Sequence, residues 1–68
     1  MMTRRLDWQA KQAYARGLPT VWLKYALHDV EACIRIWQGQ RDIDHDGNAG
    51  YYADEASVYR AELARRKA

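Results

Sequence analysis

The sequence of 68 residues predicts an all-α fold, a small domain of three helices. Apolar residues recur at intervals of three and four in three segments, which is the spacing of one helix face. Gly17 and Pro19 separate the first two segments, and residues 39–49 separate the last two. No segment alternates apolar and polar residues as a β-strand does. We expect residues 1–68 to form one domain in which helices 2 and 3 make an antiparallel hairpin and a shorter helix 1 packs across it.

The first helix is expected over residues 4–16, with Thr3 or Asp7 as its N-cap. Its inner face is expected to consist of Leu6, Ala10, Ala13 and Tyr14. Gly17 is expected to adopt the left-handed conformation that ends many helices, and Pro19 prevents continuation. A side chain at Gly17 would then strain the backbone, so Gly17→Val should cost roughly 1–2 kcal/mol.

The helix at residues 20–38 is the one around which the rest of the chain is expected to pack. Its core-facing line consists of Leu23, Leu27, Val30, Ile34 and Trp37. The apolar arc is wider than the ~100° of an ordinary surface helix, so we expect other helices to contact it from two sides. The short first helix should leave part of this arc uncovered. That part, called the open flank below, consists of Trp22, Tyr25, Asp29, Ala32 and Ile36.

An acidic loop over residues 39–49 is expected to lead into a third helix over residues 50–67. The inner line of this helix consists of Tyr52, Ala56, Tyr59 and Leu63. Basic residues occupy its last turn, where they complement the helix dipole.

The acidic loop contains half of a calcium-binding motif. Asp42, Asp44 and Asp46 have the spacing of the first three ligands of an EF-hand loop, and Gly47 stands at the position of the sharp turn. Ala53 occupies the position where that loop needs a bidentate glutamate. The expectation is therefore a solvated turn and no metal site, with the three aspartates as the alternative ligands.

The residue inventory predicts a protein that is not an enzyme. Cys33 is the only cysteine, and neither His28 nor His45 is spaced from it as in a zinc site. No nucleophile has a base and an orienting group at a recognisable spacing, so no catalytic residue and no cofactor are predicted. A lone cysteine on an apolar face fits a reducing, cytoplasmic compartment. No segment approaches the ~20 apolar residues of a membrane span, so no membrane partner is expected.

Nucleic-acid binding is the alternative function. A basic patch would form if the ends of the first and third helices lay together, because both ends are basic. Its residues would be Arg4, Arg5, Lys11, Arg16, Arg60, Arg65, Arg66 and Lys67. Against it, Glu62 stands four residues before Arg66, the spacing of a helical ion pair, and the net charge is only +2. A small DNA-binding regulator is therefore the second hypothesis.

Asp29 is a charged residue within an apolar arc, and a carboxylate there is costly unless it is paired. One interpretation is an internal partner, because an antiparallel hairpin places Tyr59 and Arg60 at the level of Asp29. The other interpretation is that Asp29 contacts a partner protein and contributes to specificity. The sequence pattern leaves both open.

The stretch Gly50–Leu63, together with Ile36 and Trp37, resembles short helical proteins of actinobacteria and their phages that have no assigned activity. This resemblance implies a small intracellular factor that binds another protein, such as a phage-encoded modulator of a host protein. The first hypothesis is thus a protein–protein interaction factor, with a homodimer as the expected state. Its expected interaction residues are Trp8, Trp22, Tyr25, Asp29 and Ile36.

Overall fold

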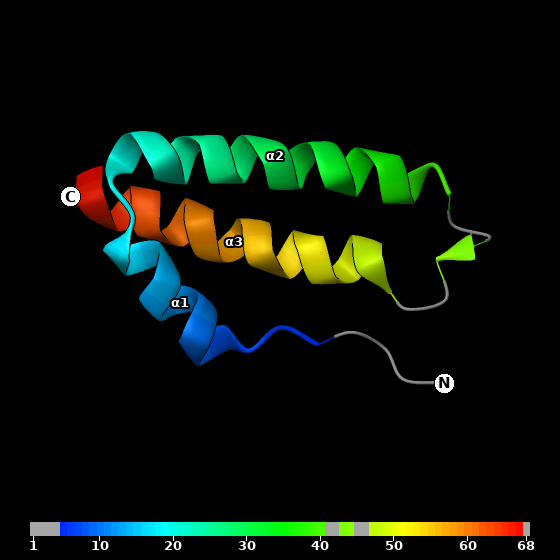
Figure 1. Ribbon diagram of the computed structural model, residues 1–68, viewed down its shortest axis with the longest axis horizontal. Helices are drawn as coiled ribbons and strands as arrows, with labels where there is room; N and C mark the ends of the chain where they lie inside the picture. The colour runs from blue at the N-terminus through cyan, green and yellow to red at the C-terminus, as the bar shows by residue number, and fades with distance from the viewer. Residues whose placement is uncertain (1–4, 41–42, 45–46, 68) are drawn as a thin grey trace.

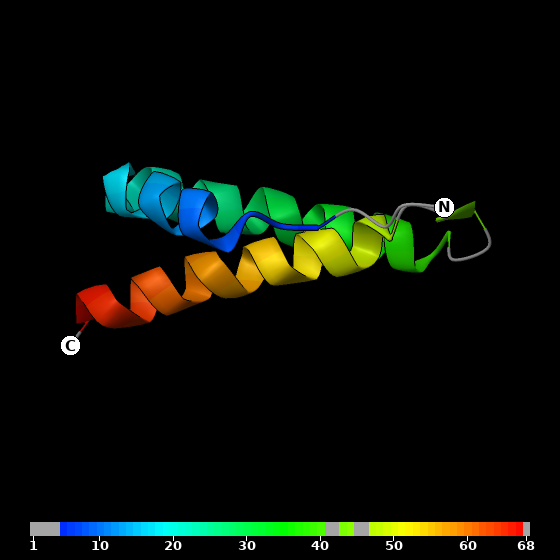
Figure 2. The same cartoon turned by 90° about the horizontal axis from the view of Figure 1, so that it is seen from below.

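The computed structural model describes residues 5–40, 43–44 and 47–67, and these residues form an all-α fold of three helices. The helices are α1 (Trp8–Gly17), α2 (Thr20–Gln38) and α3 (Asn48–Lys67). Helices α2 and α3 lie side by side and antiparallel along their length, and the shorter α1 lies against α3 (Figures 1 and 2). The predicted fold class is confirmed.

Helix α3, and not α2, is the helix on which both of the others mainly pack. One side of α3 carries Ala56 and Tyr59, which are buried as expected, and Val58 on the same helix is buried as well. From α2, Leu23 and Val30 enter the core, and Leu27 and Ile34 pack against it partly buried. The core line of α2 is therefore confirmed for Leu23, Leu27, Val30 and Ile34, whereas Trp37 is only partly buried and is not among the residues packed against this core. The expectation that α2 would be covered on two sides is wrong, because α1 packs mainly on α3.

Helix α1 starts later and uses another face than expected. It begins at Trp8, because the side chain of Asp7 caps it by accepting a hydrogen bond from the Ala10 N–H at 3.1 Å. Ala15 is the fully buried residue of α1, whereas Ala10, Ala13 and Tyr14 of the expected inner face are exposed. Leu6 is buried, but it lies before the helix. A buried alanine permits close approach to α3, which explains why α1 packs there.

The turn between α1 and α2 does not use a left-handed glycine. Gly17 is the last residue of α1 and has no positive φ angle. The chain leaves the helix at Leu18, which is extended and donates its N–H to the Ala15 carbonyl at 3.2 Å. Pro19 then stands at the N-cap of α2. The expected conformation of Gly17, and with it the expected cost of Gly17→Val, is corrected.

Gly17→Ala should therefore stabilise the protein by up to about 1 kcal/mol, because alanine has the higher helix propensity and restricts the unfolded chain. A β-carbon at Gly17 would meet no atom within 4 Å. The matched control is Gly47→Ala, since Gly47 has a φ of 71° and alanine there should cost roughly 1 kcal/mol. Thermal unfolding of both variants checks this. A destabilised Gly17→Ala protein would contradict the observed turn geometry.

Arg66 near the end of α3 fixes the turn between α1 and α2. Its guanidinium donates to the carbonyl oxygens of Ala15 and Arg16 at 3.1 and 3.3 Å, and to the Thr20 hydroxyl at 3.1 Å. Its Nε donates to Glu62 at 2.8 Å. One side chain thus joins the C-terminal end of α1, the N-terminal end of α2 and α3. These hydrogen bonds hold the end of α1 and the start of α2 in a fixed orientation relative to α3.

Candidate functional site

The open flank of α2 carries large apolar side chains that the fold leaves uncovered. Trp22, Tyr25 and Ile36 are 59%, 60% and 57% exposed. The rings of Trp22 and Tyr25 lie 5.9 Å apart at an angle of 59°, so they support each other on the surface. Contiguous exposed apolar surface of this kind is typical of contact sites.

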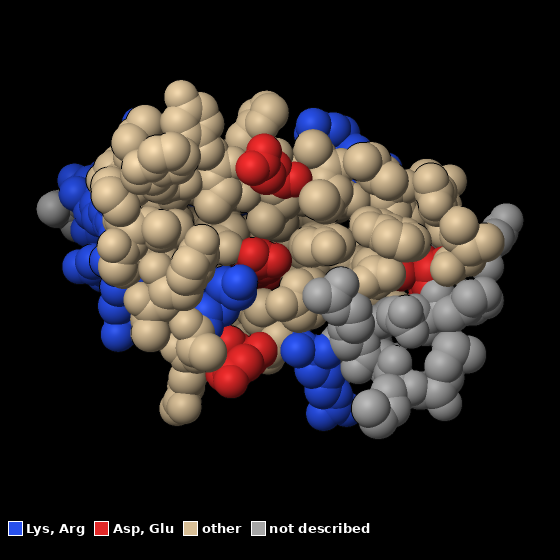
Figure 3. Space-filling model, viewed as in Figure 1, with Lys and Arg blue, Asp and Glu red and all other residues tan. Residues whose placement is uncertain are grey.

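A shallow groove of about 230 Å³ lies next to these aromatic residues. Tyr14 of α1 and Leu18 of the turn form one part of its lining, and the rest belongs to α2. The α2 residues that line it are Trp22, Tyr25, Ala26 and Asp29. The face of the molecule seen in Figure 3 is mainly uncharged, and basic side chains gather at the end where the C-terminus lies.

Asp29 is exposed at this groove, and neither of its expected partners binds it. The Tyr59 hydroxyl donates instead to Glu55 at 2.6 Å, and Arg60 donates to Glu31 at 2.9 Å. Among the residues that the structure describes, Asp29 has no hydrogen bond or ion pair. The interpretation that Tyr59 or Arg60 satisfies Asp29 inside the fold is therefore wrong.

The predicted interaction residues are exposed, but they do not form one cluster. Trp22, Tyr25 and Asp29 line the same groove, and Ile36 lies further along the open flank of α2. Trp8 is 45% exposed at the start of α1 and is not part of the groove lining. The groove also includes Tyr14 and Leu18, which sequence reasoning assigned to the core or to the turn. Only the packing of α1 on α3 reveals that they face the groove.

Two glutamates of α3, Glu55 and Glu62, are buried, and the sequence pattern predicted the burial of neither. Glu55 accepts hydrogen bonds from Lys11 of α1 at 3.2 Å and from Tyr59 at 2.6 Å. Burial, and then the hydrogen bond to Glu55, raises the pKa of the Tyr59 hydroxyl. Glutamate at a helical spacing normally indicates a solvated position, so no local signal indicates burial. Lys11, whose charge compensates for the burial of the Glu55 carboxylate, lies far away in the sequence.

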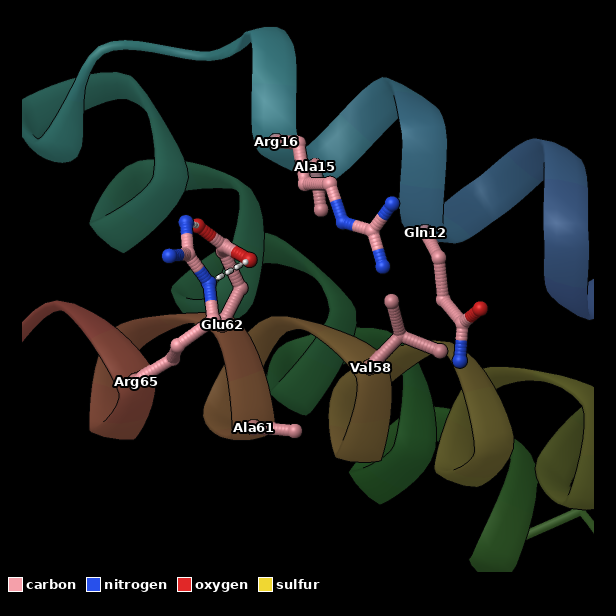
Figure 4. A pocket seen from close by; sticks show the side chains of 7 residues that line it. All are labelled: Gln12, Ala15, Arg16, Val58, Ala61, Glu62 and Arg65. Atoms are coloured by element: carbon pink, nitrogen blue, oxygen red, sulfur yellow. Dashed lines mark hydrogen bonds and ion pairs between the residues drawn. The ribbon is translucent and has the colours of Figure 1, made fainter.

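Glu62 lies where the last turns of α3 meet α1. Arg65 and Arg66 both donate to its carboxylate, and these hydrogen bonds lower its pKa to about 2, that of Arg65 contributing most. A small hollow of about 150 Å³ lies between α1 and α3, and Glu62 is part of its lining. Figure 4 shows Gln12 reaching into it from α1 and Val58 from α3. The helical pair expected between Glu62 and Arg66 is confirmed.

The lowered pKa of Glu62 predicts a pH dependence of stability with a defined sign. In the unfolded chain Glu62 takes up a proton near its ordinary pKa of 4.5, but in the folded protein it does so only near 2. Its contribution is therefore complete above pH 4.5 and is lost as the pH falls towards 2. We expect the difference in Tm between wild type and Glu62→Gln to shrink through this window. A difference that does not change between pH 4.5 and 2 would contradict the assignment.

In the acidic loop, Asp44 serves as the cap of α3. Its two carboxylate oxygens accept hydrogen bonds from the N–H groups of Asn48 and Ala49 at 2.6 and 2.9 Å. This arrangement satisfies backbone donors at the start of the helix. Asp42 and Asp46, the other two alternative metal ligands, lie outside the described residues, as does His45. Within residues 5–40, 43–44 and 47–67, no three His, Cys, Asp or Glu side chains are grouped as metal ligands.

Four of the eight basic residues expected in a nucleic-acid patch bind carboxylates of the same chain. Lys11 pairs with Glu55, Arg60 with Glu31, and Arg65 and Arg66 with Glu62. Arg5, Arg16 and Lys67 have no ion pair with the described part of the chain, and Arg4 lies outside it. The described helices include none that is long and apolar enough to cross a membrane. Cys33 is a partly exposed free thiol.

Comparison with known proteins gives no relative: no protein-family model, no curated protein and no solved structure matches the chain.

Proposed function

We propose that this chain is a small, non-enzymatic protein–protein interaction factor whose binding surface is the open flank of α2 with the adjoining groove. The observation that carries the proposal is the exposure of Trp22, Tyr25 and Ile36 on one face of a helix whose other face forms the core. Tryptophan and tyrosine are enriched among the residues that dominate binding energy at interfaces. Binding of a partner removes the apolar area of this surface from water, which is energetically favourable.

Asp29 supports the same proposal. It lies beside the aromatic residues without a partner in the described chain, so a docked protein can supply a hydrogen-bond donor or a positive charge. A charge embedded in an apolar contact selects the correct partner, because a wrong partner leaves it desolvated and unpaired. The groove offers no constellation of nucleophile and base, which favours binding over catalysis. Reducing cytoplasm is the proposed compartment, in keeping with the free thiol of Cys33.

Site-specific photo-cross-linking tests this proposal. A photoreactive phenylalanine analogue replaces Trp22 on the open flank, and in a matched protein it replaces Ala64, an exposed residue of α3. In the native host, we expect polypeptide adducts from position 22, either with the chain itself or with one other protein, and few from position 64. Adding Ile36→Glu should remove the adducts from position 22. Equal adducts from both positions, or none from position 22, would contradict the proposed surface.

DNA binding by the basic residues of α1 and α3 is the competing function. It predicts a shift of duplex DNA that weakens steeply with salt, because phosphate contacts release counterions. Since Arg60, Arg65 and Arg66 are already paired with carboxylates, we expect no such shift at physiological salt.

A further inference from the structure

We infer that the partner on the open flank is a second copy of this chain, docked antiparallel so that Tyr25 of each copy donates its hydroxyl to Asp29 of the other. This inference rests on the proposed function and assigns its partner.

The open flank has the spacing of a coiled-coil seam. Trp22, Asp29 and Ile36 follow one another at intervals of seven, and Tyr25 and Ala32 stand between them at the second seam position. The seam lies on the side of α2 away from the buried Leu23 and Val30. It is therefore available to another helix while the core of the chain stays intact.

The seam is self-complementary about a twofold axis that crosses α2 at the level of Leu27. A twofold axis there places Trp22 beside Ala32 of the second copy, a large residue beside a small one. The same axis places Tyr25, a hydroxyl donor, beside Asp29, a carboxylate acceptor. It also brings Ile36 to Leu18, an apolar residue at the turn before α2. Each pair occurs twice, as a symmetric dimer interface requires.

Other arrangements of the same two helices leave Asp29 in an unfavourable place. A parallel pair, or an antiparallel pair centred on Asp29, brings two carboxylates together. If the antiparallel pair is shifted by one heptad, Asp29 lies beside Leu18 when the shift is towards the N-terminus and beside Ala32 when it is towards the C-terminus. In both cases the facing side chain offers the carboxylate no hydrogen-bond donor. A polar residue at one seam position is known to fix register in this manner. Asp29 thus specifies the register with Tyr25.

Sedimentation equilibrium of the purified full chain is the first test. We expect a reversible dimer, and Tyr25→Phe should raise its dissociation constant by about tenfold or more, because two carboxylates lose a charged hydrogen bond. Asp54→Ala on α3 is the control and should leave the dissociation constant unchanged. A monomeric wild type, or a Tyr25→Phe protein that dimerises as wild type, overturns the inference. A monomer whose position 22 still cross-links to a different protein leaves the proposed function standing.

Disulfide trapping tests the register. Two single variants, Tyr25→Cys and Asp29→Cys, are made in a Cys33→Ala background, so that each has one thiol. Mixing them and oxidising should give a covalent heterodimer, because one Tyr25–Asp29 pair remains and the two new thiols replace the other. Either variant alone should give little covalent dimer. A mixture that gives no more covalent heterodimer than either variant alone gives homodimer would overturn the proposed register.

Discussion

Replacing Leu23 with alanine should lower the free energy of unfolding by roughly 3 kcal/mol, the usual cost of a cavity at a fully enclosed leucine. Leu23 has no exposed surface, and it lies in the core where α2 faces α3. A domain of this length buries only about 60% of its unfolded surface, so its total stability is small. We therefore expect part of the variant to be unfolded at room temperature even without denaturant. Chemical denaturation measures the change in its free energy of unfolding.

Val21→Ala is the matched control for Leu23→Ala, because Val21 belongs to the same helix and is 54% exposed. It should change stability by less than about 0.5 kcal/mol. If Val21→Ala and Leu23→Ala lose similar stability, the face of α2 that packs on α3 has been assigned wrongly.

Arg66→Met should have the second largest effect, a loss of about 2 kcal/mol. The variant leaves the carbonyl oxygens of Ala15 and Arg16 without their donor, and it removes the contact to Thr20 at the start of α2. Methionine retains much of the apolar length of arginine, so the loss reports on the hydrogen bonds rather than on packing. Urea unfolding followed by circular dichroism measures it.

Arg60→Met provides the comparison for Arg66→Met. The side chain of Arg60 is 54% exposed, and its pair with Glu31 is a surface ion pair, so its removal should cost less than about 1 kcal/mol. Equal losses in the two variants would mean that the junction of the three helices does not depend on Arg66.

The helices were predictable because their signals are local. The core line of α2 and the inner line of α3 repeat at helical spacing, and Pro19 marks the start of α2. The conformation of Gly17 was not predictable, since Leu18 leaves the helix in an extended conformation and makes a left-handed residue unnecessary. A glycine two residues before a proline is compatible with either ending.

The packing of α1 depends on contacts that no local pattern encodes. Lys11 meets Glu55 across 44 positions of sequence, and Arg66 meets Ala15 across 51. These contacts place α1 on α3 and leave one side of α2 open. The open flank itself was visible as an excess of apolar residues on α2, but its groove was not, because Tyr14 and Leu18 reach it only once α1 is in place.

The central claim, that the open flank is a contact surface and not core, is tested most directly by Ile36→Glu. Ile36 is 57% exposed, so the variant should give the circular dichroism spectrum of wild type, while light scattering should show a smaller associated mass. Ala64→Glu, at an exposed apolar residue of α3, should keep the wild-type mass. A wild type that is monomeric, together with an Ile36→Glu protein that is unfolded, would show that Ile36 belongs to the core and would contradict the claim.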